Sequence, residues 1–392
     1  MKVPGVDTAA VHKTLYFPLD EYERRLTCLR QEMSPCRLDA LLVTTPENIY
    51  YLSGYQTPGY YCKQCLLVPA NGDLIHVTRA TEETNAKALS WIGRTASYMD
   101  DQDPAELFAT VLLENGLSTA RVGIEKQGWF FSVADFETLQ RRLPACRLVD
   151  GSSLVESCRV VKSEFEIAFI RQASQVASAG MRAGIEATRE GVTEDEVAAE
   201  IQRVVTTMGS EYPGLPVFVA SGVRTSFAHA TWSGRRIERG DPVLLEISGC
   251  FKRYSAALMR SGVVGEASQQ LGKMADAAIA ALEDMLAVIR PDRPLGEVWE
   301  VWASSLERHG FQGRFKRTGY SIGVNFPPDW GEGHILSFKR GETRLLRENM
   351  TFHIPSIVKI FGISDAGFSE TVRITHDGCE ILTNCELKQF LF

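Results

Sequence analysis

The sequence lacks the features that mark membrane, secreted and nucleic-acid-binding proteins. No apolar run among its 392 residues reaches the roughly 18 residues that a membrane-spanning helix needs. The first residues contain no apolar segment of the kind found in signal peptides. Lys and Arg number 42 against 49 Asp and Glu, which gives a net charge of −7 and no basic patch. We therefore expect a cytoplasmic protein with no membrane or nucleic-acid partner.

A zinc or disulfide framework is also missing. The nine cysteines are odd in number and scattered along the chain, which is typical of reduced thiols in the cytosol. Cys62 and Cys65 form a CxxC pair, but no second pair or histidine follows at the spacing of a zinc site. We expect both to be ordinary strand residues.

The length fits two domains, and the first 158 residues alternate helical and strand patterns. Residues 20–33 repeat apolar positions at helical spacing, with Asp20 as the expected N-cap. Asn71-Gly72 between two apolar runs is typical of a tight hairpin turn. Further helices are expected at 103–115 and 133–142, and strands at 38–44, 121–125 and 147–150. This alternation predicts a small α/β domain spanning residues 1–158.

The second domain, residues 159–392, opens with a long amphipathic helix that is expected to end at Gly191. Thr193 and Glu196 form a capping box for the helix that follows. A second helix pair is expected at 267–289 and 296–309, and strand-like segments follow each pair. Two helices and then strands, twice over, predict two related halves packed around a curved sheet.

Two residues in the first half of this domain are candidates for chemistry. Glu246 lies in the apolar run VLLEISG, where a buried carboxylate must be paired or functional; the alternative is a strand-end glutamate facing solvent or an arginine. His229 precedes Trp232 by three positions. It is either a general acid and base beside an apolar platform or a loop histidine with no catalytic role.

Two further segments lie in the second half. The loop PPDWGEGH combines stiff prolines and flexible glycines with Asp329, Trp330 and Glu332, which suits recognition of a small ligand or a purely structural turn. His353 alternates with apolar residues in TFHIP, so it is either a core histidine or a site residue on the face opposite Phe352.

Together, the segments at 227–232, 243–261, 318–335 and 350–378 resemble the creatinase and methionine/proline aminopeptidase superfamily. The resemblance covers nearly the whole chain. It implies an α+β protein whose pita-bread C-terminal domain has two αβ half-repeats on a curved antiparallel sheet, behind a smaller α/β N-terminal domain. It also implies a homodimer, in which Tyr60 and Tyr61 of one subunit cover the site of the other.

In the metal-dependent members of that superfamily, five side chains hold two metal ions. Those positions fall here on Glu246, Ala257, Tyr320, Pro355 and Ser369, with Glu370 beside the last. Alanine, tyrosine, proline and serine cannot supply the carboxylates that two hard cations need. The resemblance therefore implies a metal-free enzyme with no cofactor, and the catalytic histidine of creatinase falls on His229.

GYSIGxxxPPDWGE and MTFHIP look most like the ectoine hydrolases, a metal-free branch that opens a cyclic amidine. This chain departs from that branch after Tyr254, where it reads SAALMRS, so that Ser255 and Met259 would reshape the pocket. The expected activity is metal-independent hydrolysis of a C–N bond in a small zwitterion, either ectoine or a related amidine, to acetyl-diaminobutyrate in the case of ectoine. Glu246 would act as nucleophile or general base, His229 would transfer protons, and Tyr320 would stabilise developing charge.

The remaining expected site residues are those that would contact the substrate. They are Trp232, Tyr254, Asp329, Trp330, Glu332, His353, Glu370, Tyr60 and Tyr61. A substrate carboxylate would need a cation, for which Arg253, Arg260 and Arg317 are candidates. The rival functions are a metallopeptidase such as an Xaa-Pro peptidase, a non-hydrolytic lyase or biosynthetic enzyme, and a non-enzymatic binding protein.

Overall fold

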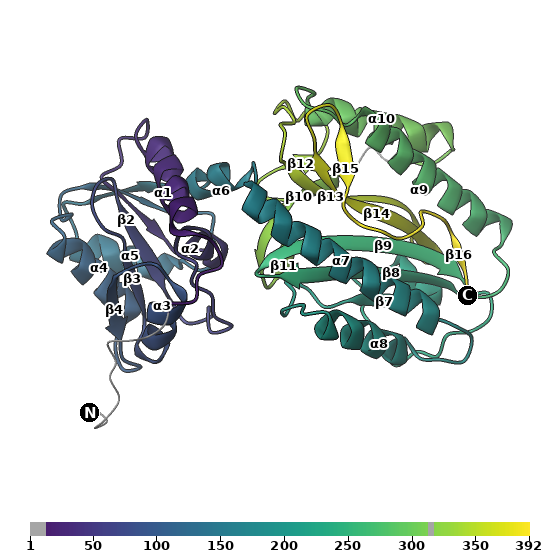
Figure 1. Cartoon of the computed structure of the whole chain (residues 1–392), viewed down its shortest axis with the longest axis horizontal. Helices are drawn as coiled ribbons and strands as arrows, with labels where there is room; N and C mark the ends of the chain where they lie inside the picture. The colour runs from purple at the N-terminus through teal and green to yellow at the C-terminus, as the bar shows by residue number, and fades with distance from the viewer. Residues whose placement is uncertain (1–12, 313–316) are drawn as a thin grey trace. The chain divides into compact units, whose positions relative to one another are not determined.

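Contacts within the chain divide it into two units between Arg159 and Val160 (Figure 1). This is one residue beyond the boundary expected from the sequence. The computed structural model describes residues 13–312 and 317–392. Each unit has its own sheet and its own apolar core. No helix of the described residues is long and apolar enough to cross a membrane.

The first unit is built on a mixed six-stranded sheet in the order β4-β3-β2-β1-β5-β6. Its strands are β1 (Ala40–Val43), β2 (Cys65–Pro69), β3 (Ile75–Arg79), β4 (Arg94–Tyr98), β5 (Arg121–Ile124) and β6 (Arg147–Asp150). Its helices are α1 (Leu19–Met33), α2 (Pro46–Ser53), α3 (Glu83–Leu89), α4 (Pro104–Glu114), α5 (Val133–Arg142) and α6 (Leu154–Arg159). The strands β1, β2 and β3 pair antiparallel, whereas β3–β4, β1–β5 and β5–β6 are parallel.

Local sequence signals explain most of this unit. Gly72 has a left-handed φ of 94° between β2 and β3, as a tight hairpin connection requires. The expected N-cap of α1 was wrong, because the helix follows Pro18 and Asp20 lies inside its first turn. An acidic residue there still interacts favourably with the partial positive charge of the helix N-terminus.

The second unit contains two helix pairs and a ten-stranded sheet. The helices are α7 (Glu164–Ala187), α8 (Glu194–Thr207), α9 (Gln269–Val288) and α10 (Leu295–Arg308). The strands are β7 (Phe218–Ser221), β8 (Pro242–Phe251), β9 (Tyr254–Val263), β10 (Thr318–Phe326), β11 (Asp329–Gly331), β12 (Ser337–Phe338), β13 (Thr351–Ile360), β14 (Ser364–Ile374), β15 (Cys379–Ile381) and β16 (Phe390–Leu391).

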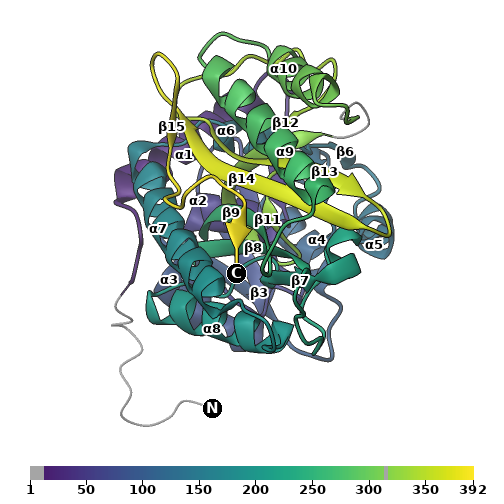
Figure 2. The same cartoon turned by 90° about the vertical axis from the view of Figure 1, so that its right-hand side faces the viewer.

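The main strands of this sheet run in the order β15-β14-β13-β10-β9-β8-β7, with antiparallel neighbours. The helix α7 packs on β8 and β9, and α9 packs on β13 and β14 (Figures 1 and 2). Each half therefore consists of a helix pair and the strands that follow it. This arrangement confirms the predicted α+β architecture with two half-repeats.

Capping residues fix where the long helices begin. Ser163 and Thr193 form capping boxes with Glu166 and Glu196 at the starts of α7 and α8. The helix α7 ends at Ala187, four residues before the expected Gly191, because the chain turns extended at Thr188.

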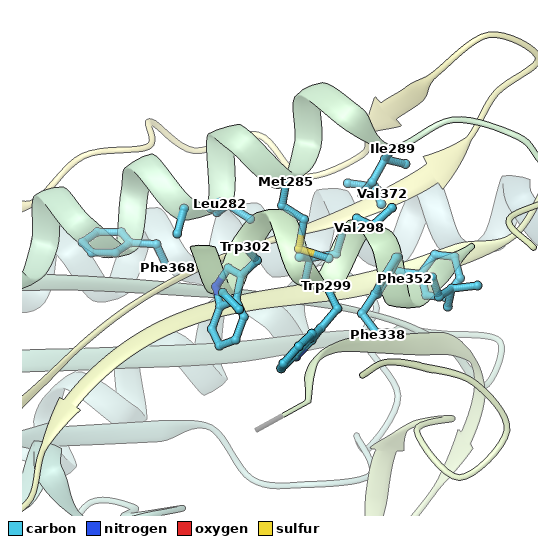
Figure 3. Close-up of a cluster of buried hydrophobic side chains, with 14 of the residues drawn as sticks. Leu282, Met285, Ile289, Val298, Trp299, Trp302, Phe338, Phe352, Phe368 and Val372 are labelled. Carbon is cyan, nitrogen blue, oxygen red and sulfur yellow. The ribbon is translucent and has the colours of Figure 1, made fainter. Parts of the chain in front are cut away.

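Alternation along the strands separates two faces of the sheet. One face of β13 and β14 carries apolar residues such as Phe352, Phe368 and Val372, which pack against Trp299 and Trp302 of α10 (Figure 3). On β8, Leu245 belongs to the matching core beneath α7 and α8. The opposite face, which we call the site face, carries the residues between these apolar positions.

Candidate functional site

Glu246 is the centre of the site face. It lies in the middle of β8, paired with Phe218 of β7 on one side and Met259 of β9 on the other. Its side chain is only 9% exposed. Among the described residues, its carboxylate has no hydrogen-bond or ion-pair partner, which is costly for a buried charge.

This environment raises the pKa of Glu246 to about 8. Burial is the main cause, and the negative charges of Asp365 and Asp329 add to it, whereas Lys359 opposes it. Asp365 pairs with Lys359 at 3.0 Å across the hairpin of β13 and β14. At neutral pH, Glu246 is therefore mostly a neutral acid that a cationic ligand would ionise.

A chain of hydrogen bonds runs along the site face close to Glu246. The indole Nε1 of Trp330 donates to the Tyr320 hydroxyl at 2.9 Å, and that hydroxyl lies 2.8 Å from Nδ1 of His353. Nε2 of His353 lies 2.7 Å from Oγ of Ser369, which also accepts the backbone N–H of Met259 at 2.7 Å. Burial lowers the pKa of His353 to about 3, so its ring is neutral.

His229 is held at the edge of this site by an unusual backbone. Its φ is 57°, in the left-handed region that few non-glycine residues adopt. Its ring centroid lies 5.8 Å from that of Phe218, the strand partner of Glu246. The ring is exposed and makes no hydrogen bond to another described residue, so it is free to meet a ligand.

Trp330 and Asp329 are consecutive residues of β11. The Trp330 ring is buried against Phe218, with centroids 5.4 Å apart. The Asp329 carboxylate accepts the backbone N–H of Gly331 at 2.9 Å. Burial is the main cause of the raised pKa of Tyr320, as it is for Glu246, and the negative charge of Asp329 adds to both shifts.

Three expected substrate contacts were wrong because the residues lie on the helix side of the sheet. Trp232 packs against the core beneath α7 and α8. The Tyr254 hydroxyl is buried and donates to Glu166 of α7 at 2.9 Å. Glu370 forms a buried ion pair with Arg260. For Tyr254 of β9 and Glu370 of β14, the period of two along the strand assigns the side chain to the face opposite Glu246.

Glu332 also does not serve as a free anion for a ligand. Its carboxylate forms an ion pair with Lys162 at 2.9 Å, and both side chains are about 1% exposed. Ser321 donates to the same oxygen at 3.0 Å. A Cβ on Gly323 would lie 2.8 Å from this carboxylate, which explains a glycine at that point of GYSIG. The expected contact with substrate is replaced by a structural ion pair.

The three arginines that are candidates to bind a substrate carboxylate differ in burial and in their partners. Arg253 is fully buried and donates to the backbone carbonyls of Asn325 and Tyr212. Arg260 is committed to Glu370. Only Arg317 of the three is exposed, with its guanidinium 5.1 Å from the centroid of the Tyr320 ring.

The two departures from the ectoine hydrolase pattern affect the pocket differently. Met259 lies beside Glu246, and its sulfur would be 2.3 Å from a Cβ on Gly367. It therefore fills the space that the glycine leaves open. Ser255 is buried, and its hydroxyl accepts a hydrogen bond from the Asn325 amide.

Tyr60 and Tyr61 belong to the first unit. Together with Lys63, Phe130 and Asp135, they line a pocket of about 150 Å³. Tyr61 is 77% exposed. Their role over the site of a second subunit stays a prediction.

The sequence analysis missed Phe218, Lys359, Asp365 and Lys162. A signal was present for Lys359 and Asp365, because they alternate along their strands in phase with the site-face residues His353 and Ser369. None was available for Phe218, because its register against Glu246 is set by the twenty residues that separate β7 from β8.

Comparison with known proteins identifies the family of this fold. Residues 168–377 match the pattern described as Metallopeptidase family M24, and residues 25–161 match the Creatinase/Prolidase N-terminal domain. The chain belongs to metallopeptidase family M24. Among curated relatives, ectoine hydrolase of Halomonas elongata is 29% identical over 402 aligned positions, which cover 97% of this chain and 100% of the relative.

A second curated relative, an uncharacterized hydrolase/peptidase of Sinorhizobium fredii, is 32% identical over 94% of this chain and 95% of its own length. Among solved structures, a prolidase of Thermococcus sibiricus has a TM-score of 0.85 at 21% identity, covering 94% of this chain and 98% of its own. A prolidase of Pyrococcus horikoshii has a TM-score of 0.82 at 23% identity, over 94% of this chain and 100% of its own. These two structures show the M24 fold, and the curated relatives support a hydrolase.

The residues of this M24 member do not fit the metal centre that the family name implies. Of the five positions assigned to metal ligands by resemblance, only Glu246 carries a carboxylate, and Tyr320 and Ser369 are hydrogen-bonded to His353. Within the ranges 13–312 and 317–392, no group of three or more His, Cys, Asp or Glu is placed to hold a metal ion.

Proposed function

We propose that this M24 member hydrolyses a C–N bond in a small zwitterionic or cationic molecule without a metal ion, and that ectoine or a related cyclic amidine is the substrate. The observation that carries the proposal is the buried, unpartnered carboxylate of Glu246. An amidinium group would pair with it and stabilise its ionised form. The 29% identity to an ectoine hydrolase over nearly the whole chain supports this substrate class.

The site supplies the groups that hydrolysis of an amidine needs. Glu246 either attacks the amidine carbon or removes a proton from a water that attacks it. His229 gives a proton to the leaving nitrogen and takes one from water afterwards. The hydroxyl of Tyr320 stabilises developing charge, and Arg317 is the exposed cation for a substrate carboxylate. The net reaction adds one water molecule, with OH going to the amidine carbon and H to the leaving nitrogen.

The test is turnover of ectoine by protein stripped of metal with a chelator, with products identified by NMR. Ring-opened acetyl-diaminobutyrates are expected, and their new oxygen should come from ¹⁸O-labelled water. The variant Glu246→Gln should lower kcat by at least roughly a thousandfold. In the wild type, kcat/KM should rise with pH until about 8, where Glu246 becomes ionised.

Two results would overturn the proposal. Cleavage of Xaa-Pro dipeptides only after Mn²⁺, Co²⁺ or Zn²⁺ is restored, with stoichiometric metal bound, would identify a metallopeptidase. A product that carries no oxygen from water would identify a lyase. A parallel set of amidines and guanidines distinguishes ectoine from its relatives, and Met259 is the first residue to examine if only a smaller ligand reacts.

A further inference from the structure

The hydrogen-bonded chain on the site face has more hydrogens than hydrogen bonds. Four contacts link Trp330, Tyr320, His353, Ser369 and the backbone N–H of Met259. Because the His353 ring is neutral, each of these five groups contributes one polar hydrogen. Five hydrogens serve four contacts, so one hydrogen must point away from the chain.

The chemistry of the two ends limits where that hydrogen is. An indole N–H and a backbone N–H can only donate, so Trp330 and Met259 each give their hydrogen to the chain. The neutral imidazole donates with one nitrogen and accepts with the other. The spare hydrogen is therefore on the hydroxyl of either Tyr320 or Ser369.

Burial decides between the two hydroxyls. The side chain of Ser369 is 0% exposed, and its Oγ has no third partner among the described residues. A hydrogen pointing away from the chain there would be buried without an acceptor, which is unfavourable. The residue Tyr320, in contrast, is partly exposed, and its hydroxyl interacts electrostatically with Glu246.

We propose that His353 and Ser369 orient the Tyr320 hydroxyl so that its hydrogen points into the site beside Glu246. Ser369 donates to Nε2 of His353, Nδ1–H of His353 donates to the Tyr320 oxygen, and that oxygen also accepts the indole N–H of Trp330. With both lone pairs occupied, the Tyr320 hydroxyl can act only as a donor. Tyr320 is then a catalytic residue that touches the substrate, and His353 and Ser369 are positioning residues.

This arrangement specifies the ligand more closely. Next to the cationic group that pairs with Glu246, the ligand must present an acceptor atom to the Tyr320 hydroxyl. In hydrolysis of an amidine, that atom is the nitrogen that leaves or the oxygen that arrives. This role rests on the proposed function, whereas the tautomer of His353 does not.

The tautomer can be read without any substrate. The intact protein is labelled with ¹⁵N in its seven histidine rings, and His353 is assigned by the signal that His353→Gln removes. We expect the hydrogen on Nδ1. A hydrogen on Nε2 would make Ser369 the acceptor and overturn the proposal, and so would a doubly protonated ring.

Variants then connect the tautomer to activity. Tyr320→Phe should lower kcat roughly a hundredfold. Ser369→Ala should lower kcat roughly tenfold and give a mixture of His353 tautomers, which a purely structural serine would not do. Ser356→Ala is the matched control, because this buried hydroxyl of the same strand pair contacts Trp302 on the helix side.

An unchanged tautomer in Ser369→Ala would contradict the positioning role. If Nδ1 of His353 is protonated but the protein does not turn over ectoine, only the assignment of ectoine as substrate is rejected.

Discussion

At the scale of single residues, burial of the Glu246 carboxyl, which the proposed reaction requires, lowers the stability of the folded protein when the group is ionised. Its pKa is about 8 in the folded protein against an ordinary value near 4.5. The folded state therefore holds the proton more tightly than the unfolded chain, and stability is lost as pH rises from about 4.5 to 8. The variant Glu246→Gln removes this loss, so we expect it to be more stable than wild type at pH 8.5, by up to roughly 5 kcal/mol.

Urea denaturation at pH 6 and pH 8.5 measures this difference. The gap between variant and wild type should widen at the higher pH. Glu300→Gln serves as control, because it makes the same change on an exposed face of α10. Equal gaps at both pH values would mean that the Glu246 carboxyl is not stabilised in its neutral form.

The sequence could single out Glu246 and His353 as buried polar residues, because each lies in an apolar run. It could not assign Tyr254, Glu370 and Glu332 correctly, because the partner of a polar side chain depends on tertiary contacts. Glu370 and Ser369 are neighbours in sequence, yet the pleat of β14 sends one to Arg260 and the other to His353.

At the scale of elements, the buried ion pair of Lys162 and Glu332 connects the segment that leads into α7 to the loop after β11. Glu332→Gln would leave a buried ammonium group without its partner, so we expect a loss of about 3–5 kcal/mol in the free energy of unfolding. The double variant Lys162→Met/Glu332→Gln should recover most of that loss. Urea denaturation of the four proteins of this mutant cycle gives the coupling energy.

The same four proteins test whether Glu332 also binds substrate. If its role is structural, the double variant should regain the KM of the wild type together with its stability. Regained stability with a KM that stays high would show that the carboxylate contacts the ligand.

The elements themselves were largely predictable. The helices α5, α9 and α10 lie within two residues of their expected bounds, and α8 begins at its expected capping box, because capping boxes and apolar periodicity are local signals. The short helices α2 and α3 were missed, because too few residues repeat for a period to be recognised.

At the scale of the whole molecule, the repeat of a helix pair and strands indicated two halves. The register between β10 and β13, which places Tyr320 against His353, could not be predicted from the sequence and is seen only in the structure.

Among the described residues, each unit buries one histidine whose pKa is lowered by burial, and that of the first unit is His76. His76 of β3 is fully buried, and neither ring nitrogen has a hydrogen-bond partner among the described residues. Its ring packs edge-on against Tyr55, with centroids 4.6 Å apart. Burial lowers its pKa to about 4 from an ordinary 6.5.

The first unit should therefore be sensitive to acid. Because the folded pKa of His76 is depressed, the unfolded chain takes up the proton first, and stability is lost as pH falls from about 6.5 to 4. The full loss is about 3 kcal/mol.

The variant His76→Phe keeps the ring packing and cannot be protonated. Its urea midpoint, followed by circular dichroism, should therefore fall less than that of wild type between pH 7.5 and 4.5. The same substitution at exposed His376 should leave the wild-type loss unchanged. An equal acid loss in His76→Phe would assign the sensitivity to other groups.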